Sequence, residues 1–393
     1  MFSHQPRKLV ITLIISSLLV PLKSFTQGRT ISEKMAFHFY NDNFFYDKEY
    51  YNFIADAYTL AGHIVRPELS FAVHPGWKLS IGIEAQKFWG INTKVHTSPV
   101  FYLMFQNRNH GLRFGSLDRN RSHKIVAPLF NPEFEYLPER REWGLQYLFQ
   151  TENIEAEAWM DWHTFIRKND SIREIINGGL RLNKKWFVTP EIEFKTPVQW
   201  VFHHRGGQIN LKGPYLEGKN AMFTVYSGMA GGALTVKMFA RSHFGFFSYY
   251  LFHHIQTVSG GSAEEIKFFD GKALWTGVGW YGNHWKTEVS YWHAEKFNAP
   301  LGADIFQTVS RKTDRYYEDG QLLEIYARHT EPTRFLWIWE TGYYHNFSEK
   351  FTFRTLLHFY YQPYFVSIPP YDFLGVAHRQ IDFVIGFNFK YQF

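Results

Sequence analysis

The final thirteen residues of the chain, 381–393, change character at nearly every step. Odd positions carry apolar or aromatic residues, namely Ile381, Phe383, Ile385, Phe387, Phe389, Tyr391 and Phe393. Even positions carry Asp382, Gly386, Asn388, Lys390 and Gln392, with Val384 as the exception. Period two predicts a β-strand. An aromatic row would be a hazard on a soluble sheet edge, but it is typical of a strand that faces lipid.

The same alternation recurs along the chain. It is clearest in 77–85, 143–149, 154–162, 186–202, 234–240, 272–281, 285–295, 335–343 and 351–361. Aromatic residues make up 20% of the chain, yet the mean hydropathy is −0.31. A barrel wall with an apolar face in lipid and a polar face in water has both many aromatic residues and a negative mean hydropathy. A helical membrane protein would instead be apolar on average. We therefore predict an all-β fold, a closed antiparallel transmembrane β-barrel.

The chain length sets the expected number of strands. At roughly 10 residues per strand plus connections, it accommodates about 16 strands, within an even range of about 14 to 18. We expect the stretch 242–263 to form two strands. With the chain end on the periplasmic side, this tally of strands places the polar segment 298–320 on the opposite side of the membrane from the other long loops, unless 304–310 is a further strand.

The N-terminus indicates export. Arg7 and Lys8 precede an apolar run from Leu9 to Leu22, which is typical of a signal peptide, and we expect residues 1–26 to be removed. That removal takes away Arg7, Lys8 and Lys23 and no acidic residue, so the net charge falls from +6 to +3 and nucleic-acid binding is not expected. Residues 27–393 then form one barrel domain, with 27–57 either a plug or the first strand. The chain has no cysteine, which excludes disulfides and a cysteine nucleophile.

Two features resemble known outer-membrane proteins. The terminal strand with its final Phe393 is similar to the signature by which Gram-negative outer-membrane barrels are recognised for insertion, which implies barrel-assembly machinery and outer-membrane lipid as partners. The segments HGLRFGSLDRNRSHKIVAPLF, ERREWGLQYLF and EAWMDWHTFI resemble uncharacterised, porin-like outer-membrane proteins of the Bacteroidota. The resemblance implies location in the cell outer membrane and supplies no activity.

The alternation assigns polar residues to the inner face of the barrel. The candidates to line the lumen or bind a solute are Arg113, Glu142, Gln146, Glu155, Glu157, Trp159, Asp161, His163, Glu191, Glu193, Lys195, His203, Arg334, Glu340, Arg354 and His358. Opposed charges across a lumen can select solutes. The alternative is that these charges pair and fill a plugged or narrow interior.

The segment 118–141 is dense in charge and contains three prolines. Its candidates for a constriction are Arg119, Arg121, Glu133, Glu135, Glu139, Arg140 and Arg141. The segment either folds into the mouth of the barrel or remains a solvated surface loop.

These features favour a porin-like channel or solute-binding pore for small polar solutes, with saccharides as one candidate class, and with no catalytic activity and no cofactor. The alternative is a non-conducting component of an export, envelope-assembly or adhesion system. A barrel enzyme is less favoured, because Ser290 and His293 have opposite parity and point to different faces of one strand. The His203-His204 and His253-His254 pairs diverge in the same way, so no metal site is expected.

Overall fold

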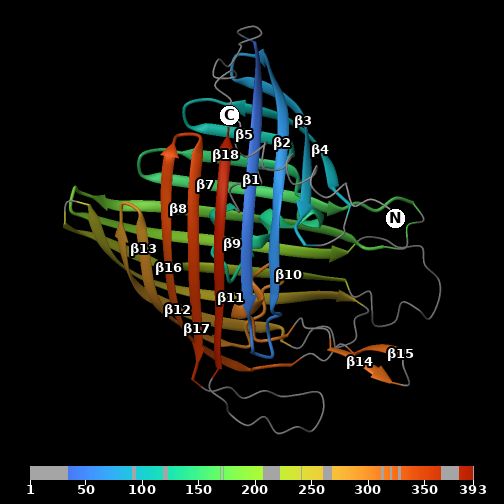
Figure 1. The fold of residues 1–393 in the computed structure, drawn as a ribbon, viewed down its shortest axis with the longest axis vertical. Helices are drawn as coiled ribbons and strands as arrows, with labels where there is room; N and C mark the ends of the chain where they lie inside the picture. The colour runs from blue at the N-terminus through green and yellow to red at the C-terminus, as the bar shows by residue number, and fades with distance from the viewer. Residues whose placement is uncertain are drawn as a thin grey trace, which may run out of the picture.

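The computed structural model describes residues 34–90, 94–117, 123–168, 170, 172–206, 222–239, 241–259, 268–310, 314–318, 321–325, 329–363 and 380–392. Within these ranges sixteen antiparallel strands form a closed barrel, in which β1 pairs with β18 (Figure 1). The predicted fold class is confirmed. Residues 1–26, for which a signal peptide is predicted, and Phe393, Arg119 and Arg121 lie outside the described residues.

The barrel strands follow one another around the wall in chain order. They are β1 (Met35–Glu49), β2 (Tyr58–His74), β3 (Trp77–Phe88), β4 (His96–Gln106), β5 (His110–Ser116), β6 (Trp143–Gln150), β7 (Ile154–Thr164), β8 (Glu174–Val188), β9 (Ile192–Gly206), β10 (Met222–Phe239), β11 (Ser242–Ser259), β12 (Asp270–Gly282), β13 (Trp285–Glu295), β16 (Thr333–Ser348), β17 (Phe351–Gln362) and β18 (Gln380–Gln392). Two further strands, β14 (Asp314–Glu318) and β15 (Gln321–Ile325), form a separate hairpin beside the barrel (Figure 1).

Two details differ from the sequence-based expectations. The stretch 242–263 does not form two strands, because β11 runs unbroken for 18 residues and pairs along its length with β10. Residues 35–49 form the first strand, which was one of the two alternatives for 27–57. The segment 304–310 is not a barrel strand: β13 pairs directly with β16, and Asp304–Phe306 is a 3-10 turn, η5.

Alternate residues of each strand face opposite sides of the wall. In β18, Asp382 and Asn388 are buried, whereas Ile381 and Ile385 are exposed on the outside. Exposed Phe246, Val278 and Trp337 continue the apolar outer surface on other strands. These apolar side chains therefore lie on the surface that meets lipid, as expected for the outer face of a membrane barrel.

Short turns and long connections lie at opposite ends of the barrel. Pro75-Gly76 and residues 189–191 make short turns at the end where β18 finishes, while the connections from β5 to β6 and from β13 to β16 lie at the other end. Outer-membrane barrels have short periplasmic turns and longer extracellular loops. The long connections thus mark the extracellular end. No helix of the described residues is long and apolar enough to cross a membrane.

Two of the long connections fold into the barrel and fill it. We call residues 123–141 and 297–310 the lumen plug. Its apolar side chains, including Leu129, Phe130, Phe297 and Phe306, form one buried cluster with inward residues from most of the wall. The two plug segments also bond to each other, from Asn131 N to Leu301 O at 2.7 Å and from Ala303 N to Ala127 O at 2.8 Å. The interior at this level is a packed core.

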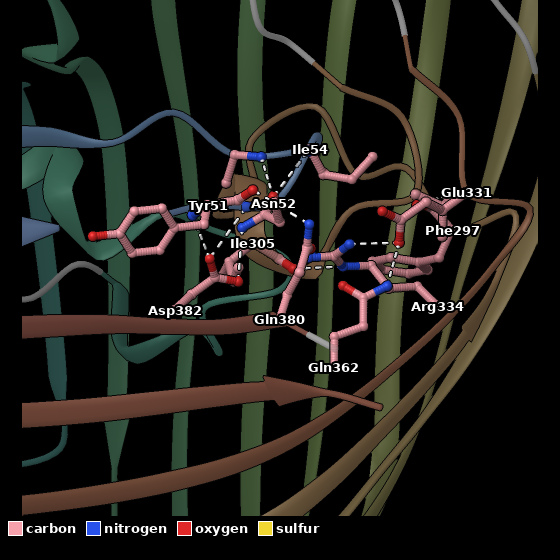
Figure 2. A network of polar contacts seen from close by, with 12 residues as sticks. Tyr51, Asn52, Ile54, Phe297, Ile305, Glu331, Arg334, Gln362, Gln380 and Asp382 are labelled. Carbon is pink, nitrogen blue, oxygen red and sulfur yellow. Dashed lines mark hydrogen bonds and ion pairs between the residues drawn. The ribbon is translucent and has the colours of Figure 1, made fainter. Parts of the chain in front are cut away.

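A buried polar network ties the plug to the wall (Figure 2). Asp382 accepts hydrogen bonds from the backbone N of Tyr51 at 2.6 Å and from Asn52 Nδ2 at 2.9 Å. Arg334 Nε donates to the carbonyl oxygen of Ile305 in η5 at 3.0 Å, and its Nη1 lies 2.5 Å from Glu331 Oε2. Because these groups are almost wholly excluded from water, their partners hold the connections in one position.

Candidate functional site

The barrel wall is low at β5 and β6. These strands have seven and eight residues, against 18 in β11. At about 3.3 Å per residue and a tilt near 40°, seven residues rise only about 18 Å, less than the apolar band of about 25 Å. The two strands alone do not span the hydrocarbon layer, so other groups complete the wall there.

The gap lies on the extracellular side of β5. Strand β4 pairs with β3 from His96 to Phe105, but it pairs with β5 only from Tyr102 to Gln106. Among the described residues, 96–101 of β4 therefore have a neighbouring strand on one side only. We call this gap, with its border at residues 116–117 and 141–143, the wall window.

Side chains close the exposed edge of β4. The hydroxyl of Ser116 accepts a hydrogen bond from Phe101 N at 3.0 Å, and Arg141 Nη1 donates to Pro99 O at 3.0 Å. Pro99 has no N–H, which suits a position without a strand neighbour. At the window, side-chain hydrogen bonds thus replace the backbone ladder that joins the other strands.

A cavity of about 30 Å³ lies behind the wall window, between the wall and the plug. Its lining combines charged groups with a few apolar ones: Arg66, Glu84, Val100, Ser116, Leu117, Phe130, Phe134, Glu135, Arg140, Arg141 and Glu142. The plug is turned toward it by two 3-10 segments, η2 (Pro132–Tyr136) and η3 (Pro138–Arg140). Both begin with proline, whose fixed φ suits the first position of a helical turn.

His123 connects this cavity to the inner wall. Its Nε2 lies 2.8 Å from Glu142 Oε2, and its Nδ1 lies 2.6 Å from Glu157 Oε1 on β7. The ring stacks on Trp159 with the centroids 3.9 Å apart and the planes at 7°. His123 and Lys124 both have positive φ, at 50° and 49°, a conformation that non-glycine residues seldom adopt. The packing around His123 thus holds the backbone in an unfavourable conformation.

Two carboxylates determine the charge of this imidazole. Burial alone would lower the pKa of His123, but Glu142 and Glu157 together raise it to about 9. The ring is therefore an imidazolium at neutral pH, donating to a carboxylate at each end. Glu142 is the more accessible of the two, with 15% of its side chain exposed against 1% for Glu157. The contacts therefore run from Glu157 on the buried inner wall through His123 to Glu142 at the cavity.

Other plug carboxylates are paired with wall cations. Glu133 forms an ion pair with Lys48, and Glu135 forms one with Lys390, which also lies 3.1 Å from Asp42 Oδ2. Arg141 pairs with Glu84 on β3. The charged segment 118–141 thus folds into the barrel from residue 123 onward, which was one of its two predicted positions.

The remaining plug candidates have simpler surroundings. The guanidinium of Arg140 lies 4.5 Å from the ring centre of Phe134, and Glu139 belongs to η3.

The residues predicted to line the lumen separate into three groups. Near the window, Arg113, Gln146, Glu157, Trp159 and Asp161 are buried on the inner wall, with Glu142, Glu155, His163 and His203 beside them. Near the periplasmic end, Glu191, Glu193 and Lys195 line a second cavity of about 620 Å³. Arg334, Glu340, Arg354 and His358 lie on β16 and β17, where His358 Nε2 is 3.0 Å from Glu340 Oε2. In the first group, Glu157 contacts His123 of the plug and Glu155 contacts Lys124.

Sequence reasoning missed His123, Ser116, Arg66 and Glu84. His123 lies outside any alternating segment, so no periodicity marks it. Arg66 and Glu84 have the parity of the inner face, but nothing in the sequence places them opposite the plug. Within the described residues, no cluster of three or more His, Asp or Glu side chains is arranged to hold a metal ion.

A family model, described as lipid A 3′-O-deacylase-type, matches residues 26–392. The chain belongs to the lipid A 3′-O-deacylase-type family. This finding overturns two expectations from the sequence, because the family is one of enzymes. The prediction of a porin-like channel is wrong, and so is the prediction of no enzymatic activity. The period-two pattern led to that error, since it reports the barrel and not what the barrel does.

Solved structures resemble this family member only distantly. Vibrio cholerae OmpT in its trimer form is 9% identical over 92% of this chain and 100% of its own, with a TM-score of 0.47. OccAB3 of Acinetobacter baumannii is 11% identical over 91% and 99%, with a TM-score of 0.45. OprD from Pseudomonas aeruginosa is 10% identical over 92% and 94%, with a TM-score of 0.46. Likenesses this distant do not bear on activity.

No curated protein matches the chain. The family and the closed barrel place this deacylase-type protein in the outer membrane, with its apolar outer wall in contact with lipid.

Proposed function

We propose that this protein hydrolyses an ester bond of a lipid A-type glycolipid at the wall window, releasing a fatty acid. The wall window is the observation that carries the proposal. An acyl ester of a lipid in the outer leaflet lies near the extracellular interface, inside the bilayer. A site for it must lie where the wall can part sideways, and the wall window, closed among the described residues by the side chains of Ser116 and Arg141, lies on the extracellular side.

The second cavity does not meet this requirement. Although larger, it is lined by the β8–β9 turn residues Thr189, Pro190 and Glu191 and therefore lies at the periplasmic end. A lipid anchored in the outer leaflet does not reach that end without crossing the membrane. We assign the reaction to the smaller cavity for this reason.

Glu142 is the proposed catalytic base. Its carboxylate borders the cavity and removes a proton from a water molecule, and the hydroxide attacks the ester carbonyl carbon. The bond from that carbon to the sugar oxygen then breaks, and the sugar alkoxide takes the proton back from Glu142. Ester and water thus give a free fatty acid and a sugar hydroxyl.

His123 and Glu157 are proposed positioning residues. The imidazolium is fixed between two carboxylates, so it orients Glu142 without contacting the substrate. Arg140 and Arg141 line the same cavity, and their positive charge would stabilise the oxyanion that forms on the carbonyl oxygen.

The test is hydrolysis of purified lipid A in detergent micelles, with loss of an acyl chain measured by mass spectrometry. Glu142→Gln should lower the rate by at least a hundredfold, in the range seen for loss of a general base. Glu193→Gln, which removes a carboxylate from the periplasmic cavity, is the matched control and should retain activity. Full activity of Glu142→Gln with correct folding would reject the assignment of the site.

Two predictions from the sequence accompany this proposal. We propose that residues 1–26 are a signal peptide and that the terminal strand with Phe393 is recognised by barrel-assembly machinery. N-terminal sequencing of the mature protein and deletion of Phe393 test them.

A further inference from the structure

The outer face of β1–β3 carries four polar residues among apolar ones such as Leu69 and Ile81, where a lipid-facing wall is normally apolar. Asn41 and Asn43 on β1, His63 on β2 and Lys87 on β3 have the parity opposite to buried Phe44, Ile64 and Gln86, so they face outward. We call these four residues the polar track. In strand register Asn43 pairs with His63, and His63 pairs with Lys87, which makes the track continuous across three strands.

The track is not confined to the ends of the strands. Asn41 and Asn43 are the seventh and ninth residues of the fifteen in β1. Polar side chains facing lipid at this depth are unfavourable, and they are a functional hypothesis by default.

The track residues are ordered by hydrogen bonds on the outer surface. Asn43 Nδ2 donates to Asn41 Oδ1 at 3.1 Å, and Trp89 Nε1 donates to His63 Nδ1 at 3.1 Å. Because an indole N–H can only donate, His63 Nδ1 is the acceptor and Nε2 carries the ring proton. His63 therefore presents an N–H donor toward the bilayer, beside the cation of Lys87 and the amide of Asn43.

The wall window separates the track from an apolar surface. Strand β4, whose free edge borders the window, is the neighbour of β3. On the other side of the window, β6–β8 expose Leu145, Met160 and Leu180. A lipid at the window thus has the hydrogen-bonding groups of the track on one side, beyond exposed Phe101 of β4, and apolar side chains on the other.

We propose that the polar track binds the sugar and phosphate headgroup of the substrate glycolipid, so that its acyl chains lie over β6–β8 and the ester reaches the window. This inference rests on the proposed hydrolysis at the window and names how the substrate is held there. The asparagine amides match sugar hydroxyl and amide groups. His63 Nε2–H and Lys87 match a phosphate, which is bound by hydrogen-bond donors and positive charge.

Binding to the full chain tests the track separately from catalysis. The background variant is Glu142→Gln, which cannot turn over the lipid if the proposed mechanism holds. The probes are bisphosphorylated lipid A and the same lipid without phosphates, with retention measured by native mass spectrometry from detergent. Asn43→Leu combined with His63→Leu should weaken binding of the phosphorylated lipid about tenfold, the effect of losing two hydrogen bonds. Leucine is compatible with a lipid-facing position, so the barrel should still fold.

Lys87→Leu should abolish the preference for the phosphorylated probe. The matched control is Thr276→Val with Thr287→Val, which removes outward hydroxyls from β12 and β13; Thr287 accepts from Trp339 Nε1 at 3.1 Å. The control should bind as the background does.

Equal binding by the track and control variants would overturn the track as a headgroup site, even if Glu142→Gln is inactive. Conversely, a catalytically active Glu142→Gln would reject the assignment of the base, and the retention comparison would still decide the track.

Discussion

The imidazole of His123 lies flat on the indole of Trp159, 3.9 Å away, and its two nitrogens contact Glu142 and Glu157. A residue of an extracellular connection is thereby attached to the inner wall of the barrel. This contact couples the stability of the plug to the charge on one ring.

The plug should loosen in alkaline solution. The folded pKa of His123, about 9, is above its ordinary value near 6.5, so its contribution is complete below about pH 6.5 and is lost as the pH rises through 9. The shift corresponds to an effect of the order of 3 kcal/mol. Amide hydrogen exchange of residues 123–141, corrected for intrinsic rates, should show this loss of protection between pH 7 and pH 10. His123→Gln should lack the step; a step of equal size in that variant would contradict the assignment.

Breaking the buried Arg334–Glu331 pair should destabilise the barrel. Arg334→Met leaves Glu331 as a buried charge without its cation, which costs about 3–5 kcal/mol. Adding Glu331→Leu should recover most of that loss, because two apolar side chains need no partners. The loss of stability and its recovery are both measured as shifts in the midpoint of heat-induced unfolding, followed on a gel. A double variant no more stable than Arg334→Met would contradict the explanation.

Glycine should be required at position 115 beside the wall window. Its φ is +113°, and a Cβ there would overlap the carbonyl oxygen of Phe101. We expect Gly115→Ala to cost about 1–3 kcal/mol and to lower hydrolysis. The control is Gly111→Ala on the same strand, where the nearest atom to an added Cβ is 3.5 Å away. Equal stability of the two variants would show that the window tolerates displacement of β5.

A charge on the outer wall should be costly only where lipid meets it. Val278 is exposed on the outside of β12, so Val278→Lys should destabilise by about 2–4 kcal/mol if its depth is near the bilayer midplane. Thr235→Lys places the same charge in the water-accessible periplasmic cavity and should be nearly neutral. Unfolding by urea in phospholipid vesicles measures both. A neutral Val278→Lys would contradict lipid contact at that strand.

Part of the candidate site was predictable from strand parity. Alternation predicted Glu142, Glu157 and Trp159 on the inner face, and Glu157 and Trp159 are buried in the structure. The charge density of 118–141 marked a segment that differs from the strands. His123 was not predictable, since its position depends on a tertiary contact with Trp159 and on a backbone conformation that local sequence does not favour.

The sequence by itself determined the barrel, because period two is a local property and a closed wall is the arrangement that hides an aromatic face in lipid while satisfying every strand. Only the tertiary structure decided where the wall is incomplete and what fills the interior. Those features depend on the register between strands and on contacts between residues far apart in the chain, such as Arg141 with Pro99 and Glu135 with Lys390. Such contacts produce no periodic pattern in the sequence, because the folded structure and not the spacing along the chain brings their side chains together.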